Sequence, residues 1–436
     1  MSTTTSADPV AAPTDGQART VLSASLIGTT IEWYDFFLFS TAAGLVFPAL
    51  FFPAGNATVG TLLSFATFAI GFVARPVGGV IFGHLGDRVG RRATLVTTMA
   101  LAGVSTALIG LLPGVASIGL WAPVLLVLLR VLGGIALGGE WGGAVLMAVE
   151  YAPPGRRGLW GSTPQIGLGL GLALGTGAFA LLGAGMDDQA FLDWGWRIAF
   201  LVSVVLVGIG LVVRLKVLET PAFRRMSQEA EVSRVPVVEV LRDAPSRRNL
   251  GYGLLARWAE GAAFNTWGVF VLTYAVSTVK MPRTEVLIAV TVGGLVSAAV
   301  VPLAGRLADR FGRRAVFGAG CAAFGVLVFP AFAALGSGSL GVVLAVLVLM
   351  LGVVYGAQSG AEATLFAELF PTRTRYTGMS LVYQGGGIYA AGLTPLILTS
   401  LLALTGGSPW LACTFLVLTA VISTFGALRL RPVVEL

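Results

Sequence analysis

The chain has 436 residues, of which 56% are hydrophobic and only 11% are charged, and its mean hydropathy is +0.87. Soluble globular domains contain about 25% charged residues, so this composition excludes a soluble protein and indicates an integral membrane protein without a separate soluble domain. The net charge of +7 does not indicate a nucleic-acid partner, because the basic residues lie mainly in the connections between apolar segments.

Twelve apolar segments follow one another along the chain, and each is long enough to cross a bilayer core as a helix. They begin near Val21, Thr58, Thr94, Ile118, Leu159, Trp196, Leu250, Glu285, Val316, Leu340, Thr377 and Pro409. The sequence therefore predicts an all-α integral membrane protein with twelve transmembrane helices.

The polar stretches divide this array. Residues 1–20 are predicted to be a disordered tail rather than a signal peptide, and residues 431–436 a second short tail. Residues 218–248 form one long polar segment of mixed charge, which we interpret as a linker with amphipathic helical pieces or as a bare charged connector. The predicted halves are then residues 21–217 and 249–430.

The basic residues predict the orientation. If the N-terminus is cytoplasmic, almost all basic residues between the spans are cytoplasmic, and only Arg197, Lys280 and Arg283 lie outside. This bias follows the positive-inside rule. It predicts a multi-pass protein of the plasma membrane, the inner membrane in a bacterium, with both termini in the cytoplasm.

The sequence also repeats itself. "GHLGDRVGRRATL" at 83–95 returns as "GRLADRFGRRAVF" at 305–317, and "EYAPPGRRG" at 150–158 resembles "ELFPTRTRYTG" at 368–378. Each pair occupies equivalent positions after the second and fourth spans of a half. Two six-helix halves arranged as parallel repeats, with a site between them near the midplane, are typical of transporters.

We expect the repeated loops to act as a gate. Their carboxylates can cap the positive N-termini of neighbouring helices and their arginines can pair with glutamates, which would close the cytoplasmic side; the alternative is that these charges only set topology. His84 is interpreted as a loop residue. The predicted gate consists of Gly83, Asp87, Arg88, Gly90, Arg91, Arg92, Glu150, Asp309, Arg310, Arg313, Arg314 and Glu368.

These motifs carry a resemblance. The two GxLxDRxGRR loops resemble the signature loop of the major facilitator superfamily. "GTTIEWYDFFLFS", "RPVGGVIFGHLGDRVGRR", "GGEWGGA", "LDWGWRIAF" and "LETPAF" are similar to its metabolite:proton symporter family, which includes proline/betaine, citrate, 2-oxoglutarate and shikimate transporters. The resemblance implies two six-helix halves, alternating access, and a central cavity lined by helices 1, 4, 7 and 10.

Charged residues inside the spans are candidate functional groups, because a charge at mid-membrane costs about 2.5 to 3.5 kcal/mol on the insertion scale. Glu32 and Asp35 share one face of helix 1, and Arg130 on helix 4 lies at a similar depth. An acid pair opposite an arginine can load and release a proton if their separation changes. We predict Asp35, Glu32 and Arg130 as the proton-coupling residues and favour Asp35, a role that the resemblance also implies; the alternative is a static buried ion pair.

A second set of polar and aromatic residues predicts a substrate cavity. Arginines suit a carboxylate and aromatic faces suit a cation, so together they favour a zwitterion or another small carboxylate. Arg75 could instead extend to the cytoplasmic surface, and Glu362, also near that end, is a weaker candidate. The predicted cavity residues are Glu140, Arg257, Glu260, Trp33, Tyr34, Trp258, Asn265 and Arg75.

Other protein classes are disfavoured. Neither lysine follows the glycine pattern of a phosphate-binding loop, and one histidine with two cysteines in apolar segments supplies no metal ligand set. We predict no enzyme, no cofactor apart from the coupling proton, and no partners beyond a small-molecule substrate and the bilayer. A proton-coupled exporter, an uncoupled facilitator, and a channel or intramembrane enzyme remain alternatives.

Glycines recur at every fourth position in two predicted helices. They are Gly134, Gly138 and Gly142 in helix 4 and Gly167, Gly171 and Gly175 in helix 5. Small residues at this spacing predict close helix packing, with sliding between helices as the alternative.

Overall fold

A computed structural model describes residues 15–53, 55–89, 91–138, 141–150, 152–218 and 236–433, and these residues form helices without any strand. The helices of the first half are α1 (Asp15–Leu45), α2 (Phe47–Leu50), α3 (Ala57–Val89), α4 (Arg91–Leu111), α5 (Val115–Ile118), α6 (Trp121–Leu137), α7 (Trp141–Glu150), α8 (Arg157–Gly161), α9 (Thr163–Ala184), α10 (Asp188–Ala190), the π-helical turn η1 (Phe191–Gly195) and α11 (Trp196–Leu218).

The second half has several π-helical turns inside its helices. Its elements are α13 (Pro236–Arg242), α14 (Ala244–Asn265), η2 (Thr266–Phe270), α15 (Val271–Ser277), α16 (Arg283–Phe311), α17 (Arg313–Leu335), α18 (Leu340–Leu347), η3 (Val348–Tyr355), α19 (Gly356–Ala367), α20 (Arg375–Ser380), η4 (Leu381–Gly385), η5 (Ile388–Gly392), α21 (Thr394–Leu404) and α22 (Trp410–Arg429).

These elements account for the twelve predicted spans. Among the described residues, nine helices are long and apolar enough to cross a membrane, and the helix of the third span has a shorter apolar part, Val96–Leu111. The first and seventh spans are α1 and α14 with α15, which carry Asp35 and Arg257 in their interiors.

The boundaries differ from the prediction at two places. Helix α1 begins at Asp15, inside the tail that was predicted to be disordered, because the polar residues before Val21 include good helix formers such as Gln17, Ala18 and Arg19. Helix α14 begins at Ala244, capped by the Asp243 side chain, which accepts a hydrogen bond from the Ser246 backbone N–H at 2.9 Å. This start lies within the predicted linker, and the residue bounds of the two halves stay a prediction.

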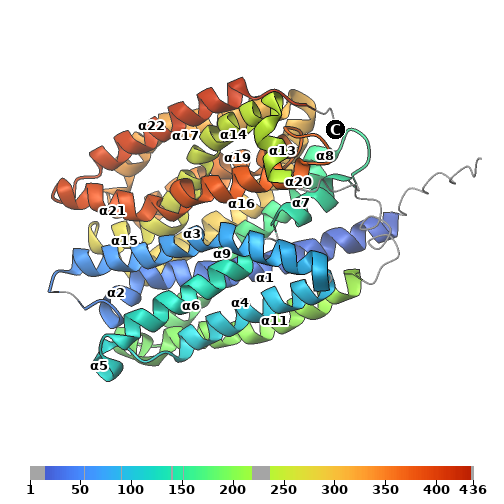
Figure 1. The fold of residues 1–436 in the computed structure, drawn as a ribbon. Helices are drawn as coiled ribbons and strands as arrows, with labels where there is room; N and C mark the ends of the chain where they lie inside the picture. The colour runs from blue at the N-terminus through green and yellow to red at the C-terminus, as the bar shows by residue number, and fades with distance from the viewer. Residues whose placement is uncertain are drawn as a thin grey trace, which may run out of the picture.

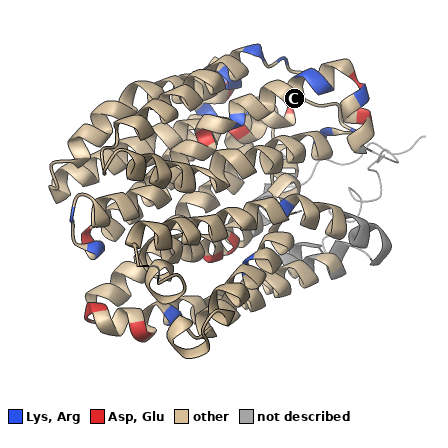
Figure 2. Ribbon diagram, turned by 60° about the vertical axis from the view of Figure 1, so that its left-hand side comes forward, with Lys and Arg blue, Asp and Glu red and all other residues tan. Residues whose placement is uncertain are grey.

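The helices run side by side as an elongated bundle (Figure 1). Helix α1 begins and α22 ends at one end of the bundle, which we call the terminal face; α2 and α5 lie at the other end, the opposite face (Figure 1). Figure 2 shows charged residues mostly near the ends of the helices, with a small group inside the bundle.

The two halves meet through glycine-lined surfaces. Helix α9 packs against α1 in its own half and against α16 in the other, and α3 packs against η5 and α21. A Cβ atom on Gly171 would lie 2.6 Å from the Cβ of Trp33, and one on Gly169 would lie 2.7 Å from the carbonyl oxygen of Gly294. The close packing predicted for the glycine series in helix 5 is therefore confirmed.

This packing predicts that Gly171→Ala destabilises the protein. Alanine normally stabilises a helix interior relative to glycine by about 0.5–1 kcal/mol, but here the added methyl group meets the α1 backbone, and overpacking costs about 1–3 kcal/mol. Gly208→Ala is the matched control, because nothing lies within 4 Å of its added Cβ. Thermal unfolding in detergent should show a lower midpoint for G171A than for G208A; equal midpoints would contradict the packing argument.

Candidate functional site

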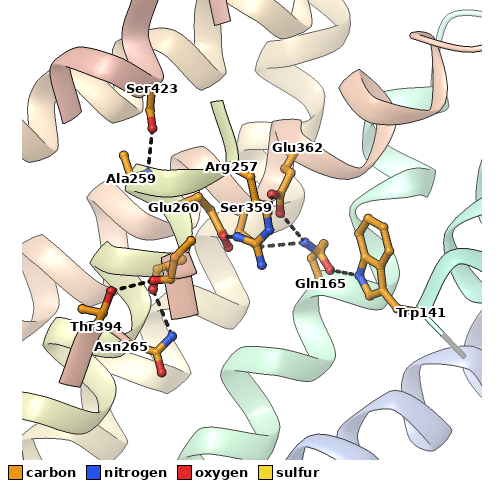
Figure 3. A network of polar contacts seen from close by, with 12 residues as sticks. Trp141, Gln165, Arg257, Ala259, Glu260, Asn265, Ser359, Glu362, Thr394 and Ser423 are labelled. Carbon is orange, nitrogen blue, oxygen red and sulfur yellow. Dashed lines mark hydrogen bonds and ion pairs between the residues drawn. The ribbon is translucent and has the colours of Figure 1, made fainter. Parts of the chain in front are cut away.

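A buried ionic network lies at the centre of the second half (Figure 3). The guanidinium group of Arg257 on α14 forms ion pairs with Glu260, one turn further along the same helix, and with Glu362 on α19, where Nε and Oε1 are 3.3 Å apart. All three residues are less than 5% exposed. One arginine with two carboxylates leaves this group with an excess negative charge whenever both acids are ionised.

Gln165 on α9 connects this network to the first half (Figure 3). Its amide nitrogen donates to Oε2 of Glu362 at 3.2 Å and to the Ser359 hydroxyl at 3.3 Å. Its amide oxygen accepts a hydrogen bond from the Trp141 indole N–H at 2.9 Å. The Trp141 ring in turn stacks on Tyr383 of η4, with centroids 3.5 Å apart. The polar network thus crosses between the halves through two hydrogen bonds of Gln165 and again through the contact between the Trp141 and Tyr383 rings.

A small cavity of about 20 Å³, which we call the central pocket, lies between the halves beside this network. This volume holds roughly one water. The Asn265 side-chain oxygen and the Tyr383 hydroxyl are buried there without a hydrogen-bond partner in the described part of the chain. Both groups are therefore available to a polar ligand. The lining residues include Trp33, Phe36, Phe72, Arg75, Leu168, Arg257, Glu260, Gly261, Phe264, Asn265, Tyr383, Gly387 and Ala391.

Arg75 faces the central pocket and is only 5% exposed. Its guanidinium carbon lies 4.5 Å from the ring centroid of Phe72, 4.8 Å from that of Phe36 and 5.7 Å from that of Trp33. The alternative that Arg75 extends to the surface is wrong, because these aromatic faces hold the charge inside the bundle.

A second cavity, the acid cavity, has a volume of about 40 Å³ and lies within the first half between α1, α4, α6 and α11. Glu32, Asp35 and Arg130 all line it, so the structure brings the three predicted proton-coupling residues to one place. Its volume is about twice that of the central pocket and corresponds to roughly two waters.

Arg130 does not form an ion pair with Asp35 within the described part of the chain. Its guanidinium carbon instead lies 4.1 Å from the ring centroid of Phe39, 4.9 Å from that of Phe36 and 5.4 Å from that of Phe68. Gly71 on α3 leaves the necessary space, since a Cβ there would lie 2.4 Å from the Arg130 Nε.

The carboxyl group of Asp35 is 8% exposed, and its Oδ1 atom has no hydrogen-bond partner among the described residues. Asp35 therefore lines the acid cavity with a buried carboxyl oxygen that no described group compensates.

Two predicted cavity residues do not join these sites. The Tyr34 hydroxyl donates to the carbonyl of Ala199 at 2.9 Å, inside the first half. Trp258 packs edge-on against Tyr389 and Phe415 inside the second half. Neither side chain lines the central pocket or the acid cavity, because helical rotation turns both into their own halves. Glu140 lies outside the described residues.

Sequence reasoning missed Gln165 and Tyr383 and gave too little weight to Glu362, which is fully buried. A lone glutamine within the apolar run of 164–184 was the available signal for Gln165, since an amide buried in an apolar helix needs polar partners. No comparable signal marked Tyr383, whose place depends on the contact between the halves.

Asp309 links the halves at the terminal face. Its two carboxylate oxygens accept hydrogen bonds from the backbone N–H groups of Gly158, at 2.7 Å, and Leu159, at 3.0 Å, in the first turn of α8. Arg313 lies 3.5 Å from Asp309 and also pairs with Glu368. The predicted cap of a helix N-terminus by a gate carboxylate is therefore formed in this conformation.

The remaining predicted gate residues differ in their contacts. Glu150 lies 3.9 Å from Arg375 across the halves. Arg314 donates to the carbonyl of Leu430 at 2.7 Å, and the Arg310 guanidinium lies over the Phe311 ring at 5.2 Å. The predicted residues of the first repeated loop, which are Gly83, Asp87, Arg88, Gly90, Arg91 and Arg92, have side chains outside the described part of the structure.

The halves also contact each other at the opposite face. Arg283 at the start of α16 pairs with Asp188 of α10 at 2.6 Å, and the Thr273 hydroxyl donates to the carbonyl of Gly44 at 3.2 Å. Contacts at both ends enclose the central pocket in this conformation.

Comparison with known proteins gives consistent matches. Residues 20–248 match the family model described as sugar (and other) transporter, and residues 253–435 match the model described as Major Facilitator Superfamily. The chain is 44% identical to the inner membrane metabolite transport protein YhjE of Escherichia coli over 86% of each chain. It is 38% identical to the shikimate transporter of Escherichia coli over 95% of each chain.

Two further matches complete the comparison. The chain is 35% identical to the proline/betaine transporter of Salmonella typhimurium over 87% of this chain and 77% of that protein. Among solved structures, the crystal structure of a D-xylose-proton symporter superposes with a TM-score of 0.71 at 18% identity, covering 93% of this chain and 97% of that one. At this low identity the structural match shows the fold alone.

The central ionic network predicts a strong effect of Arg257→Gln. This change leaves Glu260 and Glu362 buried without their shared cation, and removing one partner of a buried pair costs about 3–5 kcal/mol. Arg373→Gln is the control, because Arg373 is exposed in its pair with Glu239 and such pairs contribute about 0–1 kcal/mol. Thermal unfolding should separate the two variants, and restoring charge balance with Glu260→Gln and Glu362→Gln should recover part of the loss. Equal stability of R257Q and R373Q would contradict this account.

Proposed function

The chain belongs to the major facilitator superfamily of membrane transporters, as its repeated loops predicted, and from that premise we propose that it imports a small carboxylate-bearing or zwitterionic metabolite by proton symport. It is a transporter with the all-α fold of that superfamily and not an enzyme. The names of its relatives, which include shikimate and proline/betaine transporters, support a substrate that carries a carboxylate.

The observation that carries the proposal is the state of Asp35. It is a buried carboxyl group in a cavity that also contains Arg130, yet the two are not paired. A buried carboxylate without a counter-ion is unfavourable, and binding a proton removes that cost. Asp35 therefore holds a proton in this conformation.

Release of that proton completes the cycle. When Asp35 transfers its proton to water on the cytoplasmic side, the new carboxylate attracts the guanidinium group of Arg130, and the ion pair stabilises the proton-free state. When the cavity opens to the outside, a proton from water neutralises Asp35 and releases Arg130 to the aromatic rings. Glu32 lines the same cavity.

The substrate occupies the central pocket in this proposal. The guanidinium groups of Arg75 and Arg257 suit a carboxylate, the unpartnered Asn265 oxygen suits a donor, and the Trp33 ring suits a cationic group. The pocket must widen beyond its present volume to hold a metabolite, which fits a conformation closed at both faces.

The distribution of basic residues supports an assignment of the cytoplasmic face. The arginine-rich loops of the terminal face favour a cytoplasmic location for that face under the positive-inside rule. The Asp309 cap on α8 and the Arg375–Glu150 contact then form the cytoplasmic gate, and the Arg283–Asp188 pair belongs to the outer gate. No cofactor other than the coupling proton is required.

We predict that Asp35→Asn abolishes proton-driven accumulation but keeps substrate exchange. Asparagine preserves the shape of the side chain but cannot release a proton. The carrier with substrate bound can therefore still change conformation and exchange substrate, but it cannot transport protons. The measurement is uptake into proteoliposomes of labelled shikimate, proline, glycine betaine and 2-oxoglutarate, with and without an imposed proton gradient. Accumulation should fall at least tenfold in D35N, while counterflow stays within about threefold of wild type.

The matched control is Asp193→Asn, a carboxyl group exposed near the opposite face, which should leave both activities unchanged. Gradient-driven accumulation by D35N would show that another carboxyl group carries the proton. Wild-type uptake that ignores the gradient would overturn symport itself, and outward pumping would indicate an exporter.

A further inference from the structure

One side chain lines both cavities. Phe36 on α1 forms part of the central pocket and part of the acid cavity, directly after Asp35 in the sequence. Its ring is 2% exposed and forms the partition between the place proposed for the proton and the place proposed for the substrate.

The ring also contacts both arginines that serve these cavities. The guanidinium carbon of Arg75 lies 4.8 Å from its centroid and that of Arg130 lies 4.9 Å away. Both distances are within the range of about 6 Å for a cation–π interaction. Two cations thus share one aromatic ring.

The neighbouring rings contact one of these arginines each. Phe39 and Phe68 lie against Arg130, and Phe72 and Trp33 lie against Arg75. Phe39 lines only the acid cavity and Phe72 lines only the central pocket. Of these five rings, Phe36 is the one that contacts both arginines.

Resting on the proposed function, we infer that Phe36 is the positioning residue that couples protonation of Asp35 to substrate affinity. While Asp35 is protonated, Arg130 stays against the Phe36 ring and weakens the cation–π attraction between that ring and Arg75. Arg75 is then available to a substrate carboxylate. When Asp35 loses its proton, Arg130 moves to the carboxylate, Arg75 is held more firmly by the ring, and substrate affinity falls. Proton and substrate therefore bind together, as symport requires, and by linkage each raises the affinity for the other.

The test compares substrate affinity at two pH values in proteoliposomes, with labelled shikimate, proline, glycine betaine and 2-oxoglutarate as probes. The dissociation constant of wild type should be about tenfold lower at pH 5.5 than at pH 8, within the usual range of coupling between sites. Phe36→Leu removes the aromatic face and should reduce this ratio to less than about twofold. Phe36→Met fills a similar volume with a flexible side chain and should behave in the same way, which provides a second variant if the first does not fold.

The matched controls are Phe39→Leu and Phe72→Leu, each of which removes a ring from a single arginine. They should change affinity by similar factors at both pH values and keep the tenfold ratio. A preserved ratio in F36L or F36M would overturn the inference, and so would loss of the ratio in both controls, because that would indicate general packing. Wild-type protein that accumulates none of the probes, or binds them without pH dependence, would overturn the proposed function on which the inference rests.

Discussion

Buried charge in an apolar bundle is the constraint on which the rest of this structure depends. Each charged group inside the membrane region must be compensated locally, because lipid and apolar helices offer no solvation. Arg257 is compensated by the carboxylates of Glu260 and Glu362, while Arg75 and Arg130 lie against aromatic faces. These two solutions differ in consequence, since an ion pair holds its arginine firmly and an aromatic face leaves the guanidinium able to move to a carboxylate.

Glycine residues make both kinds of charge compensation possible, the ion pairs and the aromatic contacts. Gly71 leaves room for Arg130, and Gly386 does so for Arg257, whose Cγ would lie 2.6 Å from an added Cβ. Gly169 and Gly294 allow α9 and α16 to approach across the halves. This approach places Gln165 next to Glu362, and therefore the small residues of the helix surfaces decide where the large polar groups can meet.

The close packing between the two halves also bears on how they move against each other. The contacts between described residues at the terminal face and the opposite face include polar ones, whereas the surfaces between these faces are packed by small residues. Polar end contacts can be exchanged for water when one face opens, and small residues permit one half to tilt against the other. The central network of Gln165, Glu362 and Arg257 lies on this moving boundary, which makes it sensitive to the conformational state.

The sequence by itself determined the membrane class, the twelve spans, the repeated halves and the family, because hydropathy and loop motifs are local properties that survive in a single string of residues. It also located Glu32, Asp35 and Arg130 at matching depth, since helical rise converts residue number into depth. Only the tertiary structure decided which way each helix faces. Rotation about the helix axis is set by packing against neighbours, so Tyr34 and Trp258 turned into their own halves, Arg75 stayed inside on aromatic rings, and Gln165 reached Glu362. No periodicity within one span contains that information, because the partners lie on segments up to about 200 residues away.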